Sequence, residues 1–74
     1  WRSSVLNRDG WQCLMPGCEH QDERLEVNHI KTYAKNPELS VDINNGITLC
    51  NPCHRGIRSR EQFYENLFYA IVKN

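Results

Sequence analysis

The spacing of apolar residues along the chain predicts the order of its elements. Trp1, Val5 and Leu6 fall on one face of an N-terminal helix, which the stop signal "RDG" brings to an end. Apolar and β-branched residues in "RLEVNHI" (24–30) and "GITLC" (46–50) predict two strands. The expected plan is helix, cysteine turn, strand, loop, strand, cysteine turn and helix.

The segments around the second predicted strand have clear boundary signals. Residues 31–45, "KTYAKNPELSVDINN", contain a proline and paired asparagines, and they predict a loop too long for a tight hairpin. Asn51 is the expected N-cap of a helix, with Pro52 at its first position. Ser59 and Gln62 form a capping-box pattern at the start of a further helix. An apolar stripe predicts that this last helix packs on the strands and on Trp1 or Trp11 through Phe63, Leu67, Phe68, Ile71 and Val72.

Length and composition predict one small domain that spans residues 1–74. A chain of 74 residues, 39% of them hydrophobic, forms a core that usually needs a disulfide or metal staple. No apolar run is long enough to cross a bilayer, and no leader pattern is seen, so we expect a soluble piece of a longer chain. The formal net charge is zero, although bases gather in the second half of the chain. Charge alone therefore does not indicate a nucleic-acid partner.

The four cysteines predict a structural zinc site. Cys13 and Cys18 enclose "LMPG", Cys50 and Cys53 enclose "NP", and such short turns let thiolates converge on one tetrahedral ion. The alternatives are two disulfides of a secreted domain, or a redox pair, which normally belongs to a larger α/β unit. His54 directly follows Cys53 and belongs either to the same site or to a second one. Neighbours on a helix point about 100° apart, so Cys53 can face the zinc while His54 faces the strands.

Three blocks, "VNHI", "NNGITLC" and "CHRG", resemble those of the HNH endonuclease family. The opening "VLNRDGWQC" is also similar to the segment before this motif in family members with a four-cysteine zinc site. The resemblance covers about Val5 to Arg58. It implies a small α+β fold, the ββα-metal (His-Me finger) fold with flanking helices, and metal-dependent hydrolysis of DNA phosphodiester bonds.

The resemblance also implies roles for individual residues. His29 would be the general base, because imidazole accepts a proton near neutral pH. Asn45, or Asn44 if the alignment is shifted by one, would tie down the loop and support the base. His54 would bind a catalytic divalent cation (Mg²⁺, Mn²⁺, Ni²⁺ or Zn²⁺). The alternative for His54 is a zinc ligand in place of a cysteine.

Asn28 departs from the usual pattern of the family. The residue before the base is commonly Asp, Glu or His and serves as the second ligand of the catalytic metal, whereas an amide oxygen is neutral and binds divalent cations less tightly. Neighbours on a regular strand also point to opposite faces. For Asn28 and His29 to converge on one phosphate, the strand must lose its regular form there.

We expect DNA to be the partner, bound through its phosphates. The candidate contacts are Lys31, Lys35, Arg55 and Arg58. No motif for base readout is present, so additional domains or a partner protein would supply specificity. Family resemblance implies a cytoplasmic protein of bacterial or phage origin. Two alternatives to an active nuclease are a degenerate member that binds nucleic acid without cutting, and a zinc-stapled protein-interaction module.

Overall fold

A computed structural model describes residues 1–19, 24–32 and 34–73. Asp22 and Glu23, which separate the cysteine turn from the first strand, lie outside the described residues. The elements are helix α1 (Arg2–Arg8), strand β1 (Leu25–His29), strand β2 (Gly46–Cys50), helix α2 (Asn51–Gly56) and helix α3 (Glu61–Val72). The expected small α+β fold is confirmed. No helix in this described part has the length and apolar character needed to span a membrane.

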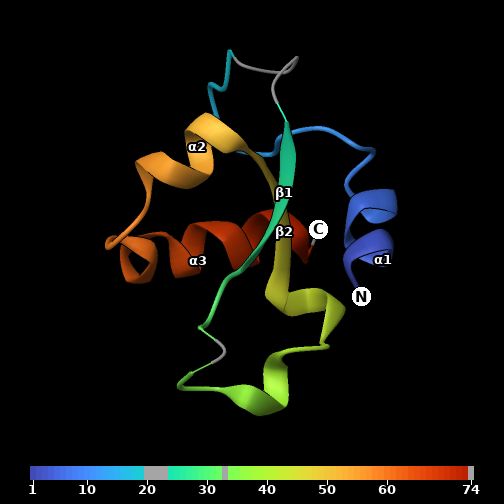
Figure 1. The fold of residues 1–74 in the computed structure, drawn as a ribbon, viewed down its shortest axis with the longest axis vertical. Coiled ribbons are helices and arrows are strands. Elements are labelled where there is room, and N and C mark those ends of the chain that lie inside the picture. Colours follow the sequence, from blue (N-terminus) through green and yellow to red (C-terminus); the bar gives the residue numbers. More distant parts are fainter. Residues whose placement is uncertain (20–23, 33, 74) are drawn as a thin grey trace.

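The strands form a two-stranded antiparallel sheet. In Figure 1, α1 lies on one side of the strands and α2 on the other, while α3 runs across them. The register pairs Leu25 with Cys50 and His29 with Gly46. All five residues of β2 are buried, whereas β1 is mostly half-buried. β2 is therefore the centre of the small core, and β1 is the strand that carries side chains toward the surface.

Helix α1 covers the edge of β2 that β1 does not pair with. The carboxylate of Asp9 accepts a hydrogen bond from the backbone N–H of Thr48 at 2.9 Å and forms an ion pair with Arg8 at 2.7 Å. The backbone N–H of Leu14 donates to the carbonyl of Thr48 at 3.0 Å. Asp9 is buried, and its charge is satisfied by the backbone N–H of Thr48 and by the guanidinium group of Arg8. The "RDG" signal thus ends the helix and also closes a strand edge.

The loop between the strands contains two short 3-10 helices, η1 (Pro37–Leu39) and η2 (Ile43–Asn45). The side chain of Asp42 accepts a hydrogen bond from the backbone N–H of Asn44 at 2.9 Å, which caps η2. Local polar contacts of this kind shape a segment that the sequence pattern describes only as a loop.

The predicted helix caps are wrong in detail. Asn51 is the first residue of α2 rather than its N-cap, and its side chain donates to Glu26 instead of capping the helix. Helix α3 begins at Glu61, two residues after Ser59, and has no side-chain cap. Ser59 has a positive φ of 70°, so it turns the chain between the helices. The contact between Asn51 and Glu26 thus takes the place of the predicted cap of α2, and the turn at Ser59 takes the place of the predicted capping box of α3.

The predicted core stripe of α3 is correct in part. Phe68 and Val72 are buried and Ile71 packs against the core, whereas Phe63 is 76% exposed and Leu67 is 41% exposed. A helix that packs on one small sheet buries only a narrow face, and these residues lie outside it. The prediction that this helix packs on Trp11 is also wrong, because the Trp11 side chain is 56% exposed.

This difference within α3 gives a stability test. Phe68→Ala should lower the free energy of unfolding by about 3–5 kcal/mol, because it leaves a cavity at the centre of the core. Phe63→Ala is the matched control and should change it by less than about 0.5 kcal/mol. Urea unfolding of the metal-loaded protein measures both. Equal losses in the two variants would contradict the packing described here.

Candidate functional site

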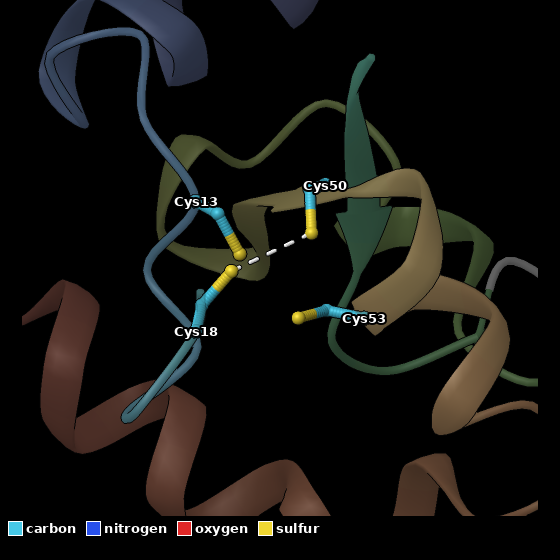
Figure 2. A group of neighbouring side chains, drawn as sticks. All are labelled: Cys13, Cys18, Cys50 and Cys53. Carbon is cyan, nitrogen blue, oxygen red and sulfur yellow. Dashed lines mark hydrogen bonds between the residues drawn. The ribbon is translucent and has the colours of Figure 1, made fainter. Parts of the chain in front are cut away.

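Four cysteines from two distant segments meet at one end of the sheet. Cys13 and Cys18 come from the turn after α1, Cys50 ends β2, and Cys53 lies in α2 (Figure 2). Their sulfur atoms all lie within 4.8 Å of one another, and the Sγ atoms of Cys18 and Cys50 are 3.6 Å apart. Four thiolates around a tetrahedral zinc at about 2.3 Å would have their sulfur atoms about 3.8 Å apart. The cluster is therefore positioned to bind a metal ion.

The surroundings of the cluster disfavour free thiolates. Burial raises the pKa of the Cys13 thiol, and burial together with the neighbouring thiols raises that of Cys53. Thiols that resist ionisation bind a metal by exchanging their protons for it. Metal binding here therefore competes with protons and should weaken as the pH falls.

His54 lies outside the cysteine cluster and contacts β1. Its Nδ1 lies 2.5 Å from a carboxylate oxygen of Glu26, whose other oxygen accepts a hydrogen bond from Asn51 Nδ2 at 2.9 Å. These bonds, chiefly that from His54, lower the pKa of the Glu26 carboxyl, so the carboxylate is ionised near neutral pH and only accepts. Nδ1 is thus the protonated nitrogen. In neutral His54, Nε2 carries the free lone pair.

Asn28 shares a strand face with Glu26, because the two residues are two positions apart on β1. Its side chain is buried, and its Nδ2 atom has no hydrogen-bond partner. The two ends of an amide can exchange by a rotation of the side chain, which would put an oxygen at the unpartnered position. An amide oxygen, an imidazole nitrogen and a nearby carboxylate are donors that suit a divalent cation. These donor types would suit a second metal site with a neutral donor at position 28, whereas no contact among those of the described residues joins Asn28 to His54.

His29 points to the other face of β1 and is half-buried. Its Nε2 lies 3.0 Å from the backbone carbonyl of Ser40, and its ring is stacked on the indole of Trp1. A carbonyl only accepts hydrogen bonds, so Nε2 carries the proton. The neutral ring then has its lone pair on Nδ1, which can accept a proton.

Asn45 is the most connected polar residue of the loop between the strands. Its Oδ1 accepts hydrogen bonds from the backbone N–H of Lys31 at 2.9 Å and from the Tyr69 hydroxyl at 2.7 Å. Its Nδ2 donates to the carbonyls of Lys31 at 3.1 Å and Leu39 at 3.3 Å, and its own carbonyl accepts from Ile30. Asn45 thus joins both ends of the loop just after His29. The neighbouring Asn44 is exposed, and its backbone N–H bonds to Asp42.

The two candidate catalytic histidines do not touch each other. Among the hydrogen bonds and ring contacts of the described residues, none joins His29 to His54. β1 keeps a regular ladder through Asn28 and His29, so the loss of regular form that their convergence requires is not seen before His29. The chain bends only from Ile30 onward.

The candidate phosphate-binding residues come from several segments of the chain. Arg55 and Arg58 are exposed on and after α2. Lys35 is exposed and also lines a hollow of about 190 Å³ that it shares with Glu61 and Glu65. Lys31 is half-buried, and its Nζ lies 6.0 Å from the centre of the Tyr69 ring. Carboxylates in the hollow make Lys35 the least favourable of these residues for binding a phosphate.

Sequence reasoning missed two residues of the site, Glu26 and Trp1. The signal for Glu26 was present, because a residue two positions before Asn28 on a strand shares its face. Trp1 lies 28 positions before His29 and no spacing rule connects them, so only the tertiary structure brings their rings together.

The geometry agrees with comparison against known families. The family model of the HNH endonucleases matches residues 12–60, which include the cysteines, His29, Asn45 and His54. The chain therefore belongs to the HNH endonuclease family, and the ββα-metal fold is consistent with this assignment. Neither the comparison with curated proteins nor that with solved structures gives a match.

The cysteine cluster leads to a prediction about metal content. The purified protein should hold about one tightly bound ion per chain, which we expect to be zinc. Cys50→Ser should lose this ion and unfold or melt at a much lower temperature, because the cluster joins the end of β2 to the turn after α1. Elemental analysis and thermal melting measure these outcomes. His54→Ala is the control and should keep the ion. A folded, ion-free protein with paired disulfides would contradict the assignment.

Proposed function

We propose that residues 1–74 act as one nuclease domain that hydrolyses DNA phosphodiester bonds, with His29 as the general base. Within this family, the observation that carries the proposal is the hydrogen bond from His29 Nε2 to the Ser40 carbonyl, at 3.0 Å. It fixes the tautomer in which Nδ1 is the proton acceptor. A buried, doubly bonded imidazole would be unable to serve as a base, whereas His29 is half-buried with one nitrogen engaged.

The chemistry of the base follows from this orientation. Nδ1 accepts a proton from the attacking water, and the ring becomes an imidazolium. The Nε2–H bond to the Ser40 carbonyl remains in place and becomes charge-assisted, so it stabilises the charged form. Asn45 supports this arrangement, because its bonds hold the loop that carries Ser40 against the end of β1.

The catalytic cation would be held by His54 through Nε2 and by Asn28 through its amide oxygen. When bound, a divalent cation supplies positive charge that stabilises the phosphate and the leaving oxygen. Glu26 fixes the tautomer of His54 by accepting its Nδ1–H, as carboxylates commonly do for metal-binding histidines. The carboxylate of Glu26 lies on the same face of β1 as Asn28. Its negative charge would partly replace the charge that an aspartate at position 28 would bring.

The four thiolates would hold a structural zinc with no open coordination position, so this ion takes no part in hydrolysis. Its work is mechanical. Cys50 and Cys53 lie on either side of the junction between β2 and α2, and His54 follows at once. Holding this junction fixes the start of the helix from which His54 reaches Glu26.

DNA would bind through its phosphates to Lys31, Lys35, Arg55 and Arg58. Contacts of this kind position a duplex without reading its sequence, so cutting by this domain alone should show little sequence preference. Additional domains or a partner protein would supply specificity. A member that binds nucleic acid without cutting is the second candidate function, and the neutral side chain of Asn28 is the observation that favours it.

The role of His29 has a direct test. His29→Ala should lower the rate of metal-dependent plasmid nicking by roughly 100- to 10,000-fold, because proton transfer by a positioned base contributes about this much. The fold and the bound structural ion should be unchanged, since His29 lies outside the cysteine cluster. His20→Ala, at a histidine to which no role is assigned, is the matched control. Undiminished cutting by His29→Ala would remove this residue from the mechanism.

The metal ligands are tested by a pair of opposite changes. Asn28→Asp adds a negative oxygen donor and should lower the Mg²⁺ or Mn²⁺ concentration that gives half-maximal nicking. His54→Ala removes a donor and should raise that concentration or abolish cutting.

The structural ion separates these effects from misfolding. Both variants should keep it, because its thiolates lie elsewhere, and elemental analysis checks this. If Asn28→Asp left the cation dependence unchanged while His54→Ala lost the structural ion, both assignments would be wrong. If the unchanged protein bound DNA but cut it with none of Mg²⁺, Mn²⁺ and Ni²⁺, the second candidate function would be favoured.

A further inference from the structure

One face of the candidate base is covered by a tryptophan from the start of the chain. The ring centres of Trp1 and His29 are 4.3 Å apart, and their planes differ by 9°. Two nearly parallel rings at this separation are in full stacking contact. The imidazole of His29 therefore cannot tilt toward α1, because the indole fills that space.

Trp1 and the helix that follows it are held at several points. The indole Nε1–H donates to the carbonyl of Asp42 at 2.8 Å, and the carbonyl of Trp1 accepts the first hydrogen bond of α1, from Val5, at 3.0 Å. At the other end of the helix, Arg8 donates to the carbonyls of Ile43 and Gly46, each at 2.6 Å. Both ends of α1 are thus attached to the segment that leads into β2. In Figure 1 this segment lies close to the N-terminus.

Gly46 provides the flat surface on which the indole lies. It is the register partner of His29, and a Cβ atom at this position would lie 2.6 Å from Cζ2 of Trp1 and 2.8 Å from Cγ2 of Val5. Its φ of −122° is one that any residue adopts. Glycine is therefore required here by the closeness of Trp1 and not by the backbone conformation.

The stack and the hydrogen bond to Ser40 constrain His29 in different ways. The indole sets the plane of the imidazole, and the Ser40 carbonyl sets its rotation within that plane. Ser40 and Asp42, which hold His29 and Trp1 respectively, belong to the same short stretch of the loop. The two rings are therefore fixed by one piece of backbone, and the lone pair of Nδ1 has a single direction.

We infer that Trp1 is a positioning residue for His29: seated on Gly46, it holds the imidazole in the orientation from which Nδ1 takes a proton. The role in catalysis rests on the function proposed above, whereas the orientation of the ring does not. A base that is misplaced by about 1 Å can lose roughly 100-fold in rate. Among the hydrogen bonds and ring contacts of the described residues, none joins Trp1 to the proposed metal ligands or to the candidate phosphate-binding residues, so its effect should fall on kcat.

The test compares Trp1→Leu with the unchanged protein, both loaded with the structural ion. In ¹H–¹³C NMR spectra, the ring protons of His29 should be shifted upfield by the indole in the unchanged protein, and this shift should be lost in Trp1→Leu. In plasmid nicking, kcat should fall about 10- to 100-fold with little change in the KM for DNA. Trp1→Phe keeps an aromatic face and should recover most of both signals.

Two further variants separate orientation from folding. Trp11→Leu removes the exposed tryptophan and should change neither the His29 shifts nor kcat. Gly46→Ala should change the His29 shifts and kcat in the same direction as Trp1→Leu, because the added methyl group would lie 2.6 Å from the indole and displaces it without replacing either ring. The methyl group would also lie 2.8 Å from Val5, so some loss of stability is expected beside these effects. Circular dichroism and elemental analysis check that each variant is folded and metal-loaded.

The inference is overturned if the His29 shifts in Trp1→Leu equal those of the unchanged protein. It is also overturned if Trp1→Leu lowers only the melting temperature and leaves kcat unaltered, because Trp1 would then be a structural residue alone. If the unchanged protein cuts no DNA with any divalent cation, the proposed nuclease function fails, and the NMR comparison still decides whether Trp1 orients His29.

Discussion

A two-stranded sheet with five residues in each strand is too small to be stable by itself, and the rest of the structure is arranged to support it. β2 is buried along its whole length, and its second edge is closed by the carboxylate of Asp9 and the backbone of Leu14. The cysteine cluster lies at its far end. Because every part of the candidate site is attached to β2 or to its partner strand, stability and site geometry depend on the same contacts.

The regular alternation of β1 divides the candidate site between two faces. Glu26 and Asn28 face α2, where His54 is held, whereas His29 faces α1 and the indole of Trp1. The same loop that carries Ser40 and Asp42 then returns the chain to β2. A reacting phosphate in contact with both faces would have to lie at the end of β1, where the chain bends after His29. This division explains why the proposed base, His29, and the proposed metal ligand, His54, have separate supporting residues.

Buried polar contacts, rather than a large apolar core, hold the loop of residues 31–45. Asn45 uses both ends of its side chain, and Trp1 and His29 each donate to a carbonyl of the loop. Networks of this kind specify one arrangement when all members are satisfied, and they are costly when one member is lost. The described residues of the loop are therefore held by polar contacts at the points where they meet the candidate base, although they contain little regular structure.

The sequence by itself determined the element order, the pairing of the cysteine turns and the family, because these depend on local periodicity and on residue types at short spacing. The tertiary structure decided the helix caps, the buried face of α3 and the partners of the histidines. Asn51 bonds to Glu26 instead of capping α2, and Trp1 crosses 28 positions to reach His29, because contacts between distant segments outweigh local preferences worth about 1 kcal/mol. Gly46 is the clearest case. The sequence places it in the second strand, and its backbone is extended as that prediction requires, but only the indole and Val5 packed against it explain why no side chain is present.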